Sequence, residues 1–197
     1  MLAALGILLL DHSVAELVHA TGMEDGSLFE LGTALLDFAT GKHISKFLLG
    51  GLVLLAGLAL AVPQRTQLAG RAMLYVGTTQ VLATLIVGVA KTWFGRLRPD
   101  QLFLATPADV TWFAQGNSFP SGHAAFYFGL MLPLACLFPK WRWPLLAVAW
   151  FIAVARIVGN HHFVSDVGAS IAFCGLLAWV LLPIAGRPRE STAMRSD

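Results

Sequence analysis

The stretch Val164–Ala185 reads VSDVGASIAFCGLLAWVLLPIA, and its one charged residue is Asp166. A helix needs about 20 mostly apolar residues to cross the hydrocarbon layer, which is about 30 Å thick, because each residue rises about 1.5 Å. Four further stretches are similarly apolar: Ile44–Val62, Ala72–Ala90, Ser121–Phe138 and Trp143–Val158. The sequence therefore predicts an all-α integral membrane protein, a bundle of five transmembrane helices.

The composition of the whole chain supports this prediction. It is 57% hydrophobic and 12% charged, whereas an average soluble domain is about 25% charged. The net charge is +2, but the basic residues are scattered, so we expect no nucleic-acid partner. Nothing in the sequence predicts a protein partner. Cys136 and Cys174 lie within apolar stretches, and we expect no disulfide between them.

The first 40 residues predict two amphipathic helices. Met1–Leu10 is apolar but too short to cross a membrane. The second helix is expected to begin at Ser27, and one of its sides carries leucines, namely Leu28, Leu31 and Leu35. We expect both helices to lie on the outer surface, at the membrane interface. The alternative is a sixth span that runs from Met1 to about Ala20.

The short basic loops predict how the bundle is oriented, because Lys and Arg accumulate on the cytoplasmic side. Alternate connections carry them: Arg65 and Arg71; Lys140 and Arg142; Arg187, Arg189 and Arg195. We therefore expect interfacial helices over 1–40, a transmembrane core over 41–186 and a cytoplasmic tail over 187–197. The opposite face then holds Lys42 and residues 91–119 and 159–163. That face is also basic, which suggests that its cations serve chemistry.

Two polar clusters on that face begin or end predicted spans. The first, KTWFGRLRP at 91–99, ends the second span, and Pro99 disfavours a helical Arg98, so the chain should turn there. The second, FPSGH at 119–123, opens the third span, where free backbone N–H groups can bind an anion close to Gly122 and His123. The alternative interpretations are membrane anchors for the first cluster, and a helix cap with an interfacial histidine for the second.

The third cluster, RIVGNHHFVSD at 156–166, joins the fourth and fifth spans. His162 and Asp166 are four residues apart, which predicts that they share one helical face and that Asp166 orients the imidazole. A structural ion pair between Arg156 and Asp166 is the alternative.

Together the clusters supply cations, a helix-terminus anion site and two histidines, which are the requirements of phosphoryl transfer without a metal. A histidine metal site is the rival interpretation. The adjacent His161 and His162 should point apart, and Asp166 is the only acid near them, so we predict neither a metal nor a cofactor.

These motifs closely resemble those of the type 2 phosphatidic acid phosphatase superfamily. The family pattern is Lys, six residues, Arg-Pro; then Pro-Ser-Gly-His; then Ser-Arg, five residues, His, three residues, Asp. The matching residues are Lys91, Arg98 and Pro99; Pro120, Ser121, Gly122 and His123; Arg156, His162 and Asp166. One departure is Ala155, which stands where the family usually has Ser.

The resemblance implies that His162, oriented by Asp166, attacks phosphorus to form a phosphohistidine, while His123 protonates the leaving alkoxide and then activates water. The phosphoryl oxygens would be held by Lys91, Arg98, Ser121, Gly122 and Arg156. The family includes soluble haloperoxidases, but five apolar spans favour its membrane lipid phosphatases.

We therefore expect a lipid phosphatase of a bacterial inner membrane, with its active site facing the periplasm or exterior. The candidate substrates are phosphatidylglycerophosphate, phosphatidic acid, undecaprenyl diphosphate and lipid A 1-phosphate, and the motifs do not choose among them. Two alternatives remain, a lipid phosphotransferase and a phosphate or lipid carrier.

Overall fold

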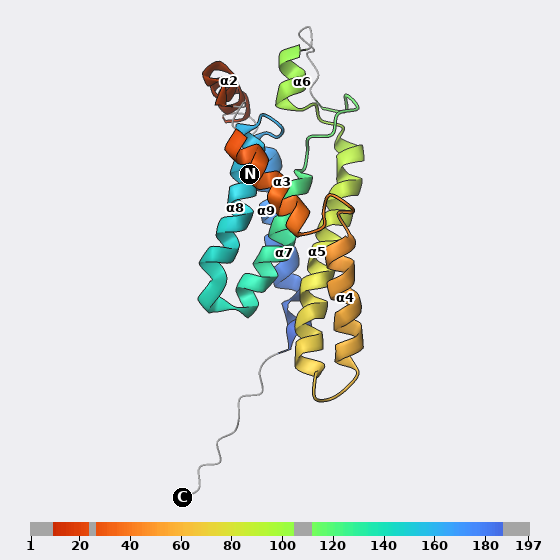
Figure 1. Ribbon diagram of the computed structural model, residues 1–197. Helices are drawn as coiled ribbons and strands as arrows, with labels where there is room; N and C mark the ends of the chain where they lie inside the picture. The colour runs from red at the N-terminus through yellow and green to blue at the C-terminus, as the bar shows by residue number, and fades with distance from the viewer. Residues whose placement is uncertain (1–9, 24–26, 105–111, 187–197) are drawn as a thin grey trace, which may run out of the picture.

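The computed structural model describes residues 10–23, 27–104 and 112–186. Every regular element in these ranges is helical, which confirms the all-α prediction (Figure 1). The helices are α2 (Asp11–Thr21), α3 (Ser27–Ala39), α4 (Leu48–Ala61), α5 (Gln67–Phe94), α6 (Pro99–Leu104), α7 (Gly122–Leu137), α8 (Arg142–Val158) and α9 (Val164–Leu181). Two short 3-10 helices, η2 (Pro139–Trp141) and η3 (Leu182–Ala185), adjoin them.

Each of the five apolar stretches contains a helix, but the helices differ in length. Three segments are long and apolar enough to cross a membrane: Gln67–Gln101, Pro139–Val158 and Val164–Ala185. Helices α4 and α7 are also apolar but contain only 14 and 16 residues. The structure thus has the helical segments of a membrane protein, whereas the number of spans, five or six, stays a prediction. The proposed sixth span begins in residues 1–9, outside the described residues.

The core is centred on α7, which packs against α5, α8 and α9. Its aromatic side chains Phe126, Tyr127 and Phe128 are completely buried or nearly so. On one side α4 and α5 form an antiparallel hairpin whose helices approach closely at glycines (Figure 1). A Cβ atom on Gly77 would lie 2.7 Å from the backbone nitrogen of Leu54, so a larger residue there would force the two helices apart.

The two N-terminal helices pack on the core, α2 against α9 and α3 against α8. The leucines predicted to form one side of α3, Leu28, Leu31 and Leu35, are all at least 59% exposed. This apolar surface suits contact with lipid, and the interfacial position stays a prediction. The inner side of α2 buries Asp11 together with Ala15 and Val18, and a buried carboxylate needs polar partners.

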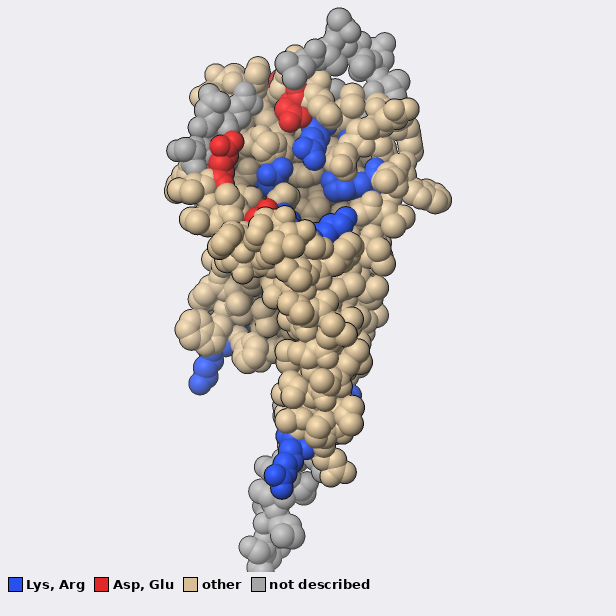
Figure 2. All heavy atoms as spheres, turned by 45° about the vertical axis from the view of Figure 1, so that its right-hand side comes forward, with Lys and Arg blue, Asp and Glu red and all other residues tan. Residues whose placement is uncertain are grey.

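The chain places its basic clusters at opposite ends of the bundle. Helix α5 carries Arg71 in its first turns and Lys91 in its last turn. Arg71 donates from Nε to the carbonyl oxygen of Ile184, so the first turns of α5 lie beside η3, which follows α9. Figure 2 shows one group of Lys and Arg side chains in a hollow near one end and others at the far end. Arg187, Arg189 and Arg195 lie outside the described residues, and the cytoplasmic orientation stays a prediction.

Candidate active site

All three predicted clusters contribute to one cavity of about 430 Å³. Its motif residues are Lys91, Arg98, Gly122, His123, Arg156 and His162. Two further lysines, Lys42 and Lys46, reach it from the connection between α3 and α4. Lys42 was expected on this face, but neither lysine belongs to a motif. The cavity is therefore more cationic than the motifs alone indicate, and it lies in the hollow seen in Figure 2.

Local structure positions the first two clusters as the sequence predicts. The helix α5 ends at Phe94, the chain continues without helix to Arg98, and α6 begins at Pro99. Lys91 Nζ donates to the carbonyl oxygen of Asn117 at 2.6 Å. A Cβ atom on Gly122 would lie 3.3 Å from Lys91 Cε, so glycine allows the lysine to lie close to the start of α7.

The three motif cations have no ion-pair partner among the described residues, although other Lys and Arg side chains form three ion pairs there. In addition, Nε of Arg156 is buried and has no hydrogen-bond partner in that part of the chain. Cations gathered beside an apolar bundle cost free energy unless an anion joins them. Lys91, Arg98 and Arg156 are therefore suited to bind a phosphate group.

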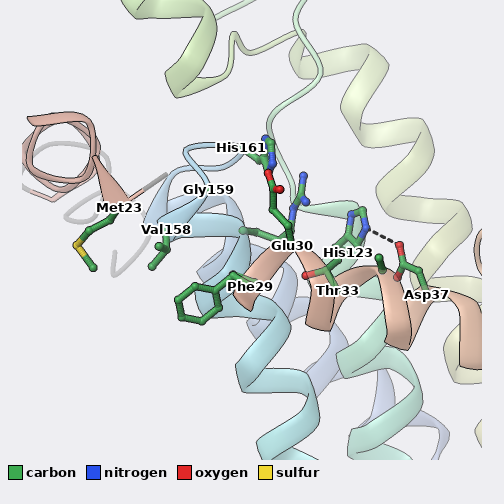
Figure 3. Close-up of a pocket in the computed structure, with 12 residues that line it drawn as sticks. Met23, Phe29, Glu30, Thr33, Asp37, His123, Val158, Gly159 and His161 are labelled. Atoms are coloured by element: carbon green, nitrogen blue, oxygen red, sulfur yellow. Dashed lines mark hydrogen bonds and ion pairs between the residues drawn. The ribbon is translucent and has the colours of Figure 1, made fainter. Parts of the chain in front are cut away.

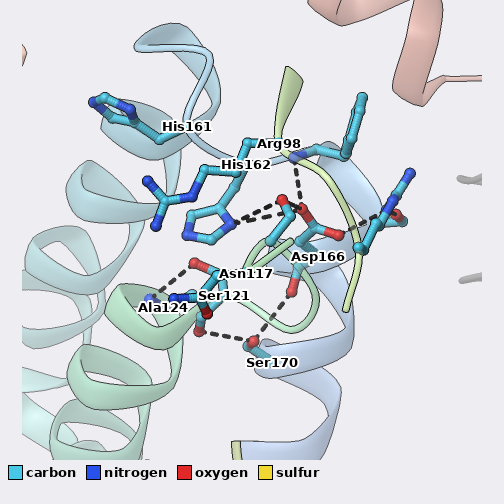
Figure 4. A network of polar contacts seen from close by, with 12 residues as sticks. Arg98, Asn117, Ser121, Ala124, His161, His162, Asp166 and Ser170 are labelled. Atoms are coloured by element: carbon cyan, nitrogen blue, oxygen red, sulfur yellow. Dashed lines mark hydrogen bonds and ion pairs between the residues drawn. The ribbon is translucent and has the colours of Figure 1, made fainter. Parts of the chain in front are cut away.

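Ser121 lies under the cavity rather than in its lining. Its side chain is buried and caps α7 by accepting a hydrogen bond from the backbone N–H of Ala124 at 3.4 Å. The backbone N–H of Ser121 donates to the carbonyl oxygen of Asp166 at 3.0 Å. The carbonyl oxygen of Ser121 accepts a hydrogen bond from Ser170 Oγ (Figure 4). These bonds tie α7 to α9. Direct phosphate binding by Ser121 and Gly122 stays a prediction.

His162 and Asp166 contact each other, as predicted, but by a different route. His162 Nδ1 lies 3.5 Å from Asp166 Oδ2 (Figure 4). The prediction that both residues share a helical face was wrong, because α9 begins at Val164 and His162 precedes it. Asp166 reaches back from the first turn, where its Oδ2 also accepts the backbone N–H of Phe163 at 2.9 Å. The same carboxylate thus both caps the helix and orients the imidazole.

The surroundings of His162 leave it neutral and directed at the cavity. Its Nδ1 faces Asp166 and also Ser118 Oγ at 3.4 Å, so a proton on Nδ1 leaves Nε2 with a lone pair. Burial, reinforced by the positive charge of Lys91, lowers the pKa of His162 to about 3, although the hydrogen bond with Asp166 acts in the opposite direction. At neutral pH the residue is therefore an uncharged imidazole, the form that can act as a nucleophile.

Behind this pair lies a buried ion-pair network that the sequence analysis did not predict. Arg96, which is 2% exposed, donates from one nitrogen to Asp166 Oδ1 at 2.7 Å and from the other to Asp11 Oδ2 at 2.8 Å. Asp11 also accepts the backbone N–H of Ser165 at 2.9 Å. Asp166 is thus paired with Arg96 and not with Arg156, the alternative suggested by the sequence. The one signal in the sequence was Asp11, a charged residue directly after the apolar stretch Met1–Leu10.

His123 also has a carboxylate partner, and it too was missed. Asp37 of α3 approaches His123 Nε2 with Oδ2 at 3.1 Å (Figure 3). Burial alone would raise the pKa of Asp37, but its hydrogen bonds with His123 and Lys42 outweigh burial and hold that pKa well below its usual range. Asp37 is therefore ionised at neutral pH. Its 86-residue separation from His123 gave the sequence analysis no signal.

His161 points away from His162, as predicted. It lines a second cavity of about 290 Å³, together with Glu30 and Arg156 (Figure 3), and its Nδ1 lies 3.9 Å from Asp100 Oδ2. In the described residues, no three His, Cys, Asp or Glu side chains come together as a metal site would require. Independence of metals stays a prediction for experiment.

Comparison with known proteins supports the motif assignment. The PAP2 superfamily model matches residues 72–190, which is more than half of the chain. The chain is 35% identical over 106 residues to a lipid A 1-phosphatase of Rhizobium etli, covering 51% of this chain and 45% of that protein. It is 31% identical over 102 residues to a lipid A 1-phosphatase of Rhizobium johnstonii, covering 50% and 42%. The chain thus aligns with less than half the length of these relatives. No solved structure gave a significant match.

Proposed function

The chain belongs to the PAP2 superfamily, and we propose that it is a membrane phosphatase that removes a phosphate group from a lipid. The observation that carries the proposal is the cavity in which Lys91, Arg98 and Arg156 face two histidines, each with its own carboxylate. The cations are suited to balance the charge of the phosphoryl oxygens, and the histidines are suited to move protons and to attack phosphorus.

In the first step His162 Nε2 attacks phosphorus while the bond from phosphorus to the lipid oxygen breaks. The electron pair of that bond goes to the lipid oxygen, which takes a proton from the His123 imidazolium. The products are the lipid alcohol and a phosphohistidine. Asp166 supports this step because it stabilises the positive charge that develops on His162.

In the second step a water molecule attacks the phosphorus of the phosphohistidine. His123, now neutral, accepts a proton from that water, and the bond from phosphorus to His162 Nε2 breaks. Phosphate leaves, His162 is neutral again and His123 is again protonated. The cations hold the same phosphoryl oxygens in both steps, so no group on the protein has to move far.

Among the four candidate lipids, lipid A 1-phosphate is the substrate that we propose to test first. Both relatives bear the name lipid A 1-phosphatase, and their alignments cover about half of this chain. Lipid substrates also suit a chain with three segments able to cross a membrane. We propose that the site faces the periplasm or exterior of a bacterial inner membrane, opposite the end that carries Arg71 and Lys140.

The test is a phosphate-release assay of the purified protein with all four lipids in detergent micelles. We expect release of inorganic phosphate in the presence of a chelator, fastest from lipid A 1-phosphate, and inhibition by vanadate, which can resemble the five-coordinate transition state. Arg156→Ala should abolish release, whereas Lys140→Ala at the opposite end should not.

Two outcomes would redirect the proposal. A carrier would bind the lipids without releasing phosphate. A phosphotransferase would transfer the phosphoryl group to a second lipid and would release no inorganic phosphate. Activity that is lost with the chelator and restored by a divalent cation would overturn the metal-independent mechanism.

A further inference from the structure

Helix α3 brings Asp37 to His123 from a part of the chain that lies outside the PAP2 match. Each oxygen of its carboxylate is bonded. Oδ1 accepts the hydroxyl of Tyr127 at 2.8 Å, and Oδ2 lies 2.7 Å from Lys42 Nζ and 3.1 Å from His123 Nε2. Its side chain is only 18% exposed, so bulk water screens these interactions weakly.

The position of His123 makes this contact relevant to chemistry. His123 lies in the first turn of α7 and lines both cavities, whereas Asp37 lines only the smaller one. An imidazole has two nitrogens, so when Nε2 is held by a carboxylate, Nδ1 is left to exchange a proton with a substrate. Burial of this ring disfavours its protonated form, and the neighbouring cations Arg156 and Lys42 add to that effect.

We infer that Asp37 is a positioning residue for His123: it fixes the orientation of the ring and stabilises the imidazolium that must donate a proton to the leaving group. This inference rests on the proposed phosphatase activity. Tyr127 and Lys42 in turn hold the carboxylate in place. The N-terminal segment thereby becomes part of the catalytic apparatus rather than a membrane attachment alone.

Asp37→Asn tests the inference, because it removes the negative charge while it keeps the size of the side chain and an oxygen for Tyr127. With a lipid phosphate, whose alkoxide must be protonated, we expect kcat to fall by about 10-fold to 10²-fold. With an aryl phosphate, whose leaving group needs far less help, we expect a loss of less than about threefold. The ratio of aryl to lipid rates should therefore rise. Glu16→Gln, which removes an exposed charge on α2 that lines neither cavity, should leave the ratio unchanged.

The double variant separates positioning from a general structural role. If Asp37 acts through His123, adding Asp37→Asn to His123→Ala should lower the lipid rate by less than about twofold more. Losses that multiply, or an unchanged aryl-to-lipid ratio in Asp37→Asn, would overturn the inference. If His123→Ala itself had no effect on the lipid substrate, the proposed acid role would fail instead, independently of Asp37.

The measurement remains informative for a destabilised protein. Both rates are taken from one sample, so their ratio does not depend on the fraction that is folded. Should Asp37→Asn give no folded protein, Asp37→Glu keeps the carboxylate and is expected to keep the ratio within about threefold of that of the unaltered chain. Tyr127→Phe removes one support of the carboxylate but leaves its contact with His123, so the ratio should rise less than in Asp37→Asn, and a larger rise would contradict the inference.

Discussion

Two histidine–carboxylate pairs serve the same cavity, and they are built in different ways. Asp166 and His162 belong to one turn of the chain, and Asp166 is completely buried. Asp37 and His123 are 86 residues apart, on α3 and α7, and Asp37 is partly exposed. The first pair is therefore fixed by local backbone structure. The second exists only when an N-terminal helix packs on the bundle.

The two carboxylates also differ in the cation that balances them. Asp166 is paired with Arg96, which lies away from the lining of the cavity and is itself paired with Asp11. Asp37 is paired with Lys42, which lines the cavity and so can contact a substrate. The nucleophile His162 is therefore supported by a fully buried ion pair. The proton donor His123 is supported by an ion pair whose cation, Lys42, lines the substrate cavity.

The largest effect that we predict is for His162→Ala, which removes the nucleophile of the first pair. Activity should fall by about 10⁴-fold or more on lipid and aryl phosphates alike, because both reactions begin with the attack of this imidazole on phosphorus. No acid-labile phosphoenzyme should form when the variant is mixed with radiolabelled substrate and quenched.

The roles assigned to the two pairs would be contradicted if His162→Ala kept activity on the aryl ester while His123→Ala lost activity on both substrates. With both variants folded, that result would mean that the two histidines have exchanged roles.

A smaller loss, about 10³-fold to 10⁴-fold, is expected for Asp166→Asn. The amide cannot stabilise a positive charge on His162, and it can hold the ring in the wrong tautomer. Arg96 keeps its ion pair with Asp11, so the protein should stay folded. Because both substrates need the nucleophile, the lipid and aryl rates should fall together. A selective loss on the lipid would assign Asp166 to leaving-group protonation instead.

The structure shows which parts of this comparison can be predicted from sequence. Helical segments follow from long apolar stretches, and the contact between His162 and Asp166 follows from their spacing, since four residues bring side chains together in a helix or in the turn before it. The predicted fifth span begins at Val164, as α9 does, but the prediction that His162 shares a helical face with Asp166 did not allow for this helix start. Helix ends depend on caps, and here the cap is the same carboxylate that orients the histidine.

The second pair and the Arg96 network could not be predicted, because they join distant segments. Asp11 and Asp37 lie 85 and 86 residues from their partners, Arg96 and His123. Periodicity places each on its own helix but does not say how that helix packs. Arg96 stood within the first cluster, yet nothing in its spacing distinguished a buried ion-pair partner from the cations that line the cavity.

His123→Ala removes the histidine of the second pair and should lower the rate mainly with lipid phosphates. General acid catalysis typically contributes about 10² to 10⁴ in rate, so a loss of that order is expected with a lipid phosphate. With an activated aryl phosphate the loss should be below about 10-fold. Steady-state kcat for both substrates measures the difference, and equal losses on the two would contradict the assignment of His123 as the acid.

The smallest effect that we predict is for Asp11→Asn, which alters the outermost member of the first pair's network. Asp11 contacts Arg96 and Ser165 rather than either histidine, and Arg96 would keep its bond to Asp166. We expect kcat to fall by less than about 10-fold and the free energy of unfolding by about 1–3 kcal/mol, the usual cost of weakening buried hydrogen bonds. The lower stability should appear as a lower thermal unfolding midpoint in detergent, while Glu16→Gln on the same helix should unfold like the unaltered chain.

The aryl-to-lipid ratio of Asp11→Asn should stay constant, in contrast to its rise in Asp37→Asn, because Arg96 supports the nucleophile that both substrates require. A rise of that ratio in Asp11→Asn would show that the two N-terminal carboxylates act on the same histidine, and the separation of the two pairs would have to be abandoned.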